Sequence, residues 1–130
     1  MKITGLDHLV LTVADVMAAI KFYQYALGME AEKFTPTDGS ERWALKFGTQ
    51  KINLHQLGDE FEPKAIRATA GSSDLCFLSD VAVADWQAHL AKQDIELIDG
   101  PVQRTGANGA IFSVYFRDLD GNLLEIANQL

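Results

Sequence analysis

A weak internal repeat is the feature that most constrains the fold of this chain. Near the start the sequence reads Gly-Leu-Asp-His-Leu-Val-Leu-Thr-Val (Gly5–Val13), and in the middle it reads Gly-Ser-Ser-Asp-Leu-Cys-Phe-Leu-Ser (Gly71–Ser79). Aligning the two segments places His8 opposite Asp74. Because self-similarity within a chain indicates a repeated supersecondary unit, the sequence predicts two similar modules.

Each half also ends in a short strand-like run that carries one ligand-type residue among apolar ones. The residue is His55 in the first half and Glu125 in the second. Imidazole and carboxylate groups are common ligands of divalent transition metals. The repeat therefore predicts a metal site on a pseudo-two-fold axis, with His8, His55, Asp74 and Glu125 as ligands. This mixture of ligands suits Zn²⁺, Ni²⁺, Mn²⁺ or Fe²⁺ and does not select one of them.

The hydrophobic pattern predicts the same element order, β-α-β-β-β, in both halves. Apolar residues alternate in the expected strands and recur at helical spacing in the expected helices. Asp15 is the expected N-cap of the first helix and Gly28 its C-cap. In the first half the strands are expected over 6–13, 30–34, 42–47 and 51–56, with the helix between the first two.

The second half repeats this order after a charged connector over residues 59–70. Module 1 is therefore expected over about 1–58 and module 2 over about 71–130, in a single domain of 130 residues. The glycine-containing segment 100–109, which carries Arg104, is expected to be a loop. The other elements expected here are strands over 74–78, 96–98, 111–116 and 122–127, a helix over 80–92 and a turn over 118–121.

Strand alternation predicts which side chains share a face with the ligands. If the leucines beside His8, His55 and Glu125 pack under the helices, these three ligand-type residues point the other way. We expect Trp43 and Phe47 on one strand, and Tyr115 on another, to point the same way. The result would be a small-molecule cavity with polar groups at its base and aromatic walls.

Composition excludes several classes of partner. The net charge of −7 argues against a nucleic-acid binder, which would carry a basic stripe. No apolar run approaches the roughly 20 residues of a membrane span. The single cysteine, Cys76, has no partner for an internal disulfide, so the cytoplasm is the expected location.

The chain resembles the vicinal oxygen chelate superfamily, which includes glyoxalase I, bleomycin resistance proteins and extradiol dioxygenases. The segments that carry the resemblance are Leu6–Val13, Phe22–Met29 and Tyr115–Glu125. Within the superfamily the chain is most similar to the glyoxalase domain-containing protein 5 subgroup. The resemblance implies an α+β fold in which two βαβββ modules form a cupped, mostly antiparallel mixed sheet around a divalent metal. It also implies a homodimer.

The sequence departs from the family patterns at several positions. Glyoxalase I-like sites generally have a carboxylate where His55 stands, and histidine or glutamine where Asp74 stands. Extradiol enzymes usually carry a histidine in the segment that here reads Gly106–Gly109, and a proline where Leu119 stands. Ring cleavage is therefore disfavoured, although Tyr115 matches the tyrosine of those enzymes.

These observations favour a metal-dependent enzyme that acts on a small oxygenated substrate, as an isomerase, lyase or epimerase. Glu125 or Asp74 is expected to move the proton, with Tyr115 as the alternative group. Asp74 is either a ligand or an acceptor for a histidine N–H. Arg104 is either a clamp for an anionic substrate or a solvated side chain. The rival hypothesis is a binding protein that sequesters an aromatic or antibiotic-like molecule without chemistry, and a third is a degenerate module that serves only as an oligomer scaffold.

Overall fold

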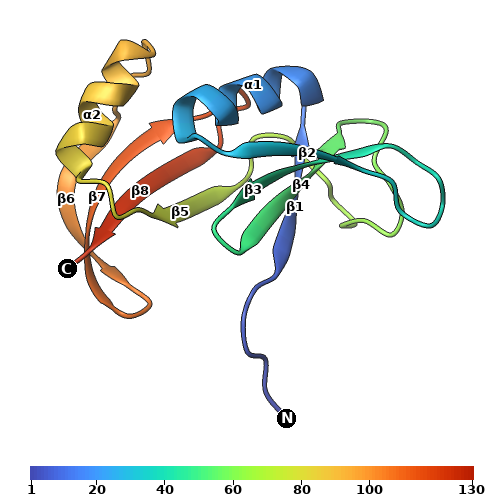
Figure 1. Cartoon of the computed structure of the whole chain (residues 1–130), viewed down its shortest axis with the longest axis horizontal. Helices are drawn as coiled ribbons and strands as arrows, with labels where there is room; N and C mark the ends of the chain where they lie inside the picture. The colour runs from blue at the N-terminus through green and yellow to red at the C-terminus, as the bar shows by residue number, and fades with distance from the viewer. The chain divides into compact units, whose positions relative to one another are not determined.

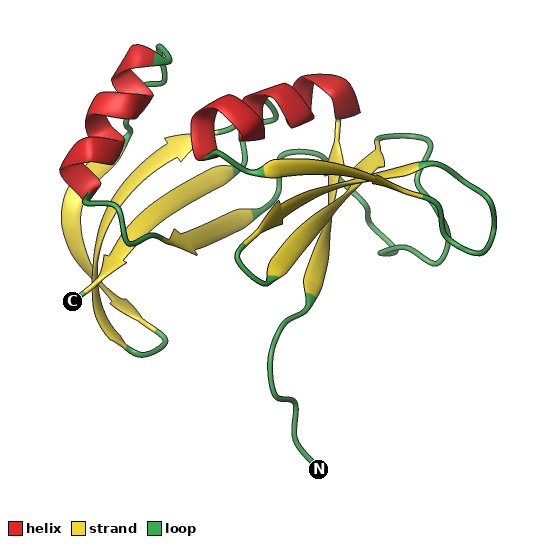
Figure 2. Cartoon of the chain, viewed as in Figure 1, coloured by secondary structure: helices red, strands yellow, loops and turns green.

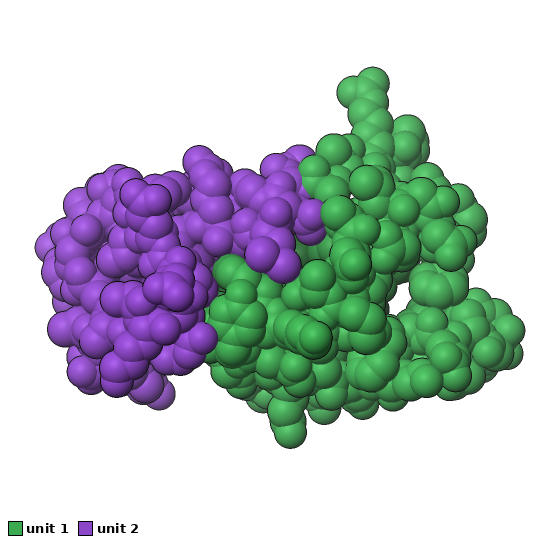
Figure 3. All heavy atoms as spheres, turned by 90° about the horizontal axis from the view of Figure 1, so that it is seen from above, with its two compact units in different colours: residues 1–70 green, residues 71–130 purple.

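The computed structural model describes residues 1–130, which divide into two compact units, residues 1–70 and residues 71–130 (Figure 3). Both units have the predicted βαβββ order, each with one helix and one four-stranded mixed sheet (Figure 2). This confirms the predicted α+β class. None of the helices has the length and apolar character required to cross a membrane.

The first unit contains one sheet in the order β1-β4-β3-β2, with helix α1 against one of its faces (Figure 1). Strands β1 and β4 are parallel, and the other pairs are antiparallel. Asp15 caps α1 by accepting a hydrogen bond from the Ala18 amide, and Gly28 ends it at φ 66°, both as predicted. The elements are β1 (His8–Val13), α1 (Val16–Leu27), β2 (Glu30–Phe34), β3 (Arg42–Phe47) and β4 (Gln50–Gln56).

The second unit repeats this arrangement in the order β5-β8-β7-β6, with α2 packed on β7 and β8. Strands β5 and β8 form the parallel pair, as β1 and β4 do in the first unit. The predicted turn after β7 is present, because the Gly121 amide donates to the Asp118 carbonyl. The elements are β5 (Asp74–Leu78), α2 (Val83–Lys92), β6 (Asp99–Gly106), β7 (Gly109–Arg117) and β8 (Leu123–Gln129).

One segment differs from the sequence expectation. Residues 100–109 form most of strand β6 and its hairpin turn, not a loop, and the strand predicted over 96–98 is absent. The reason is that Gly106 and Gly109 pair with each other and flank a two-residue turn. Glycine suits such turns because it tolerates positive φ, and Gly109 has φ 102°. The residues before Gly106 are therefore free to continue as a strand, and Arg104 lies on it.

Helix α2 begins at Val83, three residues later than the predicted start at Asp80. Its first amide finds a partner far away in the sequence, because Val83 N donates to Asn128 Oδ1 at 2.9 Å. A helix start that depends on a side chain of another strand has no local sequence signal.

Candidate functional site

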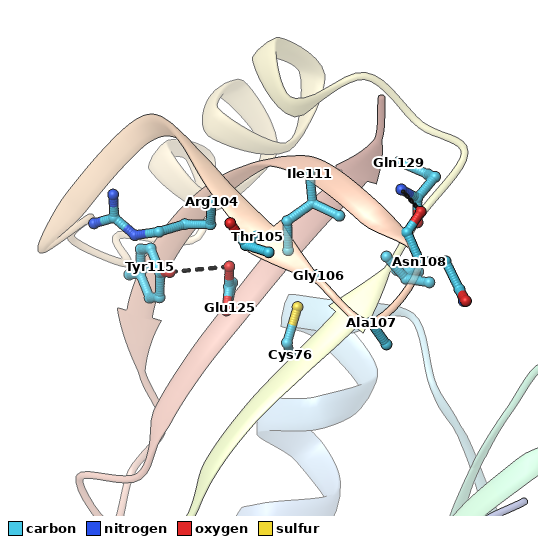
Figure 4. Close-up of a pocket in the computed structure, with 11 residues that line it drawn as sticks. Cys76, Arg104, Thr105, Gly106, Ala107, Asn108, Ile111, Tyr115, Glu125 and Gln129 are labelled. Carbon is cyan, nitrogen blue, oxygen red and sulfur yellow. Dashed lines mark hydrogen bonds between the residues drawn. The ribbon is translucent and has the colours of Figure 1, made fainter.

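The second unit contains a cavity of about 380 Å³ on the face of its sheet opposite α2 (Figure 4). A volume of this size accommodates a small organic molecule. The side chains come from four strands and the β6–β7 turn. The lining includes Cys76, Arg104, Ile111, Tyr115, Glu125 and Gln129.

Glu125 lies at the centre of this cavity because of the strand register. On β8 it pairs with Tyr115 of antiparallel β7 on one side and with Cys76 of parallel β5 on the other. Paired residues project to the same face of a sheet, so all three side chains line the cavity. Ser113 and Ile111 alternate with Tyr115 along β7 and therefore share this face of the sheet.

The Tyr115 hydroxyl donates a hydrogen bond to Glu125 Oε1 at 2.9 Å, drawn as the dashed line in Figure 4. Glu125 is only 8% exposed. A polar group removed from water to this extent requires a hydrogen-bond partner, and the Tyr115 hydroxyl provides one. The pair is therefore a carboxylate held in a fixed position by a phenol, with a cavity in front of it.

Arg104 supplies the positive charge of this site. Its guanidinium carbon lies 5.6 Å from the centre of the Tyr115 ring, and its Nη2 lies 3.2 Å from Asp99 Oδ2. The side chain is about two-fifths exposed, so the ion pair with Asp99 is weak and exchangeable. Arg104 is therefore able to bind an anionic group that enters the cavity.

The two other ionisable groups beside Glu125 are held in their neutral forms. Partial burial, followed by the charge of Glu125, raises the pKa of the Cys76 thiol to about 12, although the residue reaches solvent. Burial also raises the pKa of the Tyr115 hydroxyl, and its hydrogen bond to Glu125 acts in the same direction. At neutral pH the cavity therefore presents a phenol and a thiol, and neither is a nucleophile.

Of the predicted ligands in the first unit, His55 is buried and His8 is exposed. His55 is 6% exposed on β4, its ring stands edge-on to Phe61, and its pKa is lowered mainly by burial and then by the charge of Arg42. His8 opens β1, where Nδ1 lies 2.7 Å from Asp7 Oδ1.

The register separates these two histidines. His8 pairs with Lys51, whereas His55 pairs with Thr12, four positions further along β1. Four positions correspond to about 13 Å along a strand. Side chains stand nearly perpendicular to the sheet, so His8 and His55 do not bind one ion together.

The register also corrects the assumed equivalence of His55 and Glu125. In the second unit Glu125 pairs with Cys76, two residues after Asp74. In the first unit the partner of Val10, two residues after His8, is Asn53. Asn53 is therefore the structural counterpart of Glu125, and its Oδ1 is buried without a hydrogen-bond partner.

The aromatic wall predicted from β3 lies on the other side of the sheet. Trp43 pairs with Leu54, and Phe47 lies on the same face, which is the face covered by α1. His55, one residue after Leu54, points the opposite way. The expected common direction of Trp43, Phe47 and His55 is therefore wrong, because the phase of alternation between strands cannot be read from each strand alone.

Asp74 stands exposed at the start of β5, on the same face as Glu125 and two positions from it. Within either unit, no three histidine, cysteine, aspartate or glutamate side chains gather in a metal-binding cluster. Sequence reasoning missed the cavity residues Gln129 and Thr105. The alternation of β8 indicates Gln129, which pairs with Ile111 on the cavity face. Thr105 follows Arg104 directly and pairs with Ala110, so strand alternation gives no signal for it.

Comparison with known proteins gives consistent matches over the whole chain. The sequence model of the Glyoxalase/Bleomycin resistance protein/Dioxygenase superfamily matches residues 5–126. Virulence protein STM3117 of Salmonella typhimurium is 50% identical over 127 residues, which are 98% of this chain and 85% of that protein. Glyoxalase domain-containing protein RDO1 of Mycosarcoma maydis is 49% identical over 128 residues, 98% of this chain and 70% of that protein.

Solved structures give the same result. Integron cassette protein VCH_CASS1 of V. cholerae is 55% identical with a TM-score of 0.94, over 100% of this chain and 98% of that one. Two more distant structures share the fold. They are lactoylglutathione lyase from Agrobacterium tumefaciens, at 24% identity, TM-score 0.72 and coverage of 98% and 96%, and TnmS3, an antibiotic binding protein from Streptomyces sp. CB03234, at 21% identity, TM-score 0.75 and coverage of 100% and 99%.

Proposed function

Since the chain belongs to the Glyoxalase/Bleomycin resistance protein/Dioxygenase superfamily, we propose that it is an enzyme that moves a proton on a small oxygenated substrate. The observation that carries this proposal is the Tyr115–Glu125 hydrogen bond, which fixes a largely buried carboxylate inside a cavity. The reaction class is an isomerisation, an epimerisation or a lyase reaction. In each case the proposed first step is removal of a proton from a carbon beside an oxygen-bearing group.

Glu125 is the proposed general base. An ionised carboxylate has about four acceptor positions, and the Tyr115 hydroxyl uses one of them. One of the remaining acceptor positions takes the proton from the substrate. Tyr115 keeps the carboxylate oriented, and Arg104 binds an anionic or developing oxyanionic group of the substrate. General-base catalysis of this kind contributes roughly 10²- to 10⁴-fold in rate.

A divalent metal ion is the cofactor that we propose for this reaction. The oxygen donors of Asp74 and Glu125, which share one face of the second sheet, fit an ion of the Zn, Ni, Mn or Fe group as two of its ligands. The separation of His8 and His55 along the first sheet excludes a single ion bound by both of them. When bound, the ion would polarise the oxygen of the substrate.

The metal proposal is tested by elemental analysis of protein purified without chelator and by thermal unfolding before and after chelation. A metal that binds only the folded protein stabilises it by mass action. We therefore expect about one ion per chain and a lower melting temperature after its removal. An unchanged melting temperature after complete removal would contradict the proposal.

The enzyme proposal is tested with Glu125→Gln, which keeps the size of the side chain and removes its negative charge. Wild type and variant are screened against α-hydroxy ketones, thiohemiacetals and catechols. We expect turnover to fall by at least about 100-fold in the variant. Glu96→Gln, on an exposed residue of the same unit, is the matched control and keeps wild-type turnover.

The alternative is a protein that sequesters a small molecule without chemistry. The observation that favours it is that Cys76 and Tyr115 are both held in their neutral, unreactive forms. Tight binding without product, equal in wild type and Glu125→Gln, would establish this alternative. Ring cleavage is the least supported chemistry, because the β6–β7 turn reads Gly106–Gly109 without a histidine.

We also propose that the protein is a homodimer. Each four-stranded sheet has two edge strands, and exposed edges favour association with another chain. Symmetric dimers are the commonest soluble oligomers. Light scattering at micromolar concentration should give twice the mass of one chain, and a single-chain mass would contradict the proposal.

A further inference from the structure

Each sheet contains one pair of parallel strands that are distant in the sequence. β1 pairs with β4 in the first unit, and β5 pairs with β8 in the second. A hairpin turn fixes the register of many antiparallel pairs, whereas a parallel pair has no such turn. Another feature of the molecule must therefore fix how β5 lies on β8. This register matters for the candidate site, because it brings Asp74 to the same face as Glu125.

Carboxamide side chains lie at both ends of each parallel pair, at equivalent positions in the two units. In the first unit, Gln50 Nε2 donates at 2.9 Å to a backbone carbonyl just before β1, and Gln56 Nε2 donates at 2.6 Å to one just after β1. The equivalent residues of the second unit, by strand register, are Asn122 and Asn128. The repeated use of carboxamides at these positions indicates that they hold the parallel strands together.

Asn122 binds the backbone at the start of β5. Its Oδ1 accepts a hydrogen bond at 2.8 Å from the amide of Ser73, the residue directly before Asp74. The backbone continues this contact, because the Leu123 amide donates to the Ser73 carbonyl at 3.0 Å. Asn122 is fully buried, so a substitution that removes its oxygen would leave the Ser73 amide without this partner.

The carboxylate of Asp118 orients the Asn122 carboxamide. Asp118 Oδ2 accepts from Asn122 Nδ2 at 2.7 Å, and Asp118 Oδ1 accepts from the backbone amides of Asp120 and Asn122. Hydrogen bonds to an ionised acceptor are stronger than those between neutral groups. Because the carboxamide nitrogen faces this carboxylate, the carboxamide oxygen is directed to the Ser73 amide.

The chain before β5 also approaches this turn closely at Gly71. A Cβ atom at this position would overlap the carbonyl oxygen of Asp120, and the backbone has φ 83°. Both conditions favour glycine. The contact at Gly71 and the hydrogen bond at Ser73 together fix how the chain enters β5.

We propose that Asn122, oriented by Asp118, is a positioning residue for the candidate site of the second unit. It acts through the backbone of Ser73 and holds Asp74 on the cavity face, two positions from the partner of Glu125. The ion-binding role of Asp74 and Glu125 rests on the proposed function. The placement of Asp74 by Asn122 does not rest on it.

Amide hydrogen exchange, followed for single residues by nuclear magnetic resonance, tests this placement without a metal. Asn122→Ala should accelerate exchange of the Leu123 amide, because its acceptor, the Ser73 carbonyl, is held less firmly. The Ser79 amide, which donates to the Ala127 carbonyl after β5, is the internal reference. We expect the acceleration at Leu123 to exceed that at Ser79 by about tenfold. Equal acceleration of both amides would overturn the proposal, because Asn122 would then only stabilise the fold.

Asn128→Ala is the matched control at the other end of β8. The Asn128 side chain donates to the Ser79 and Val81 carbonyls and accepts from the Val83 amide. Its loss should destabilise the protein and accelerate exchange of the Ser79 amide more than that of the Leu123 amide. This is the reverse of the pattern expected for the first variant, and the same pattern in both variants would contradict a local role.

Mn²⁺ is the probe for the effect on the candidate site. Paramagnetic broadening of the Asp74 and Glu125 signals reports an ion at this face, and its dependence on Mn²⁺ concentration gives the affinity. Asn122→Ala should weaken Mn²⁺ binding by about tenfold, as loss of a residue that supports a metal ligand does. Asn128→Ala should bind Mn²⁺ as the wild type does, and equal affinity in the two variants would overturn the proposal. If the wild type binds no Mn²⁺, the metal proposal fails, and the exchange rates still decide whether Asn122 places Asp74.

Exchanging the two side chains gives a rescue test, which also decides if Asn122→Ala does not fold. Asp118→Asn alone directs one NH₂ group at another, and should accelerate exchange of the Leu123 amide. Combining Asp118→Asn with Asn122→Asp restores a carboxamide donor facing a carboxylate, and leaves an oxygen for the Ser73 amide. The net charge is unchanged. The double variant should therefore return toward the wild-type exchange rate, and a double variant as fast as Asp118→Asn would overturn the proposal.

Discussion

Tyr115 and Glu125 face each other across the β7–β8 ladder, and the Tyr115 hydroxyl donates to Glu125 Oε1 at 2.9 Å (Figure 4). This bond gives the carboxylate a fixed direction inside the cavity. Burial raises the pKa of the Tyr115 hydroxyl, and this hydrogen bond acts in the same direction, because the phenol donates only while it keeps its proton. The same hydrogen bond therefore partners a buried carboxylate and orients the proposed general base.

The first prediction is that this pair is coupled energetically. Tyr115→Phe leaves a largely buried carboxylate with one donor fewer, and Glu125→Leu removes the acceptor of the Tyr115 hydroxyl, so each substitution deletes the hydrogen bond. In a double-mutant cycle read by urea unfolding, we expect a coupling of about 1 kcal/mol. Additive effects of the two substitutions would show that the hydrogen bond contributes nothing to stability.

The second prediction concerns the reactivity of Cys76. A thiol with a pKa of about 12 is almost entirely protonated at pH 8, so alkylation by iodoacetamide should be slow and should accelerate as pH rises toward 12. Glu125→Gln removes a negative charge that raises this pKa, so alkylation at pH 8 should become faster. Mass spectrometry of the modified protein gives the rates. Rapid alkylation of the wild type at pH 7 would contradict the assigned environment.

The sequence alone predicts the order of helices and strands, but it does not predict which side chains of neighbouring strands point to the same face of the sheet. Asp15 and Gly28 bounded the first helix correctly because capping and the left-handed conformation have local signals. The predicted direction of the Trp43 side chain is wrong, because that direction depends on the pairing of Trp43 with Leu54, which is distant in the sequence. A shift of one residue in register reverses the face of every side chain in a strand.

The candidate site shows the same limit. Glu125 could be singled out from the sequence because a carboxylate flanked by Leu124 and Ile126 in a strand is rarely buried unless it is paired or bound, and the structure places it in the cavity. Its counterpart in the first unit is Asn53 and not the predicted His55, because a metal-binding residue type does not reveal the position of a residue in the strand register. Strand pairing is what identifies the equivalent positions. Val10 pairs with Asn53 in the first unit, as Cys76 pairs with Glu125 in the second.

The third prediction is a pH dependence of stability that arises from His55. Burial lowers the pKa of this histidine in the folded state below its ordinary value of 6.5, so the unfolded chain binds the proton more readily. The contribution of His55 to the free energy of unfolding is therefore fully present above pH 6.5. It is lost as the pH falls from 6.5 toward the pKa of the folded state. Urea unfolding between pH 7 and pH 5 measures the loss.

His55→Gln should flatten this part of the pH profile, because it removes the titrating group. His8→Gln, at an exposed site, should leave the profile as in the wild type. An identical slope in wild type and His55→Gln would assign the pH dependence to other groups.

The last prediction concerns a buried hydroxyl in the second sheet. Ser113 is fully buried on β7, and its Oγ has no hydrogen-bond partner. Burying an unpaired hydroxyl costs roughly 1–3 kcal/mol in proteins, so Ser113→Ala should raise the free energy of unfolding by about 1 kcal/mol after the small loss of packing.

Ser79→Ala is the matched control, because Ser79 Oγ accepts from Trp86 Nε1 at 2.8 Å and from the Val81 amide at 3.1 Å. That variant should lose about 1 kcal/mol. Urea unfolding of both variants gives their free energies of unfolding. If Ser113→Ala is destabilised as much as Ser79→Ala, the Ser113 hydroxyl has a hydrogen-bond partner in solution, namely water.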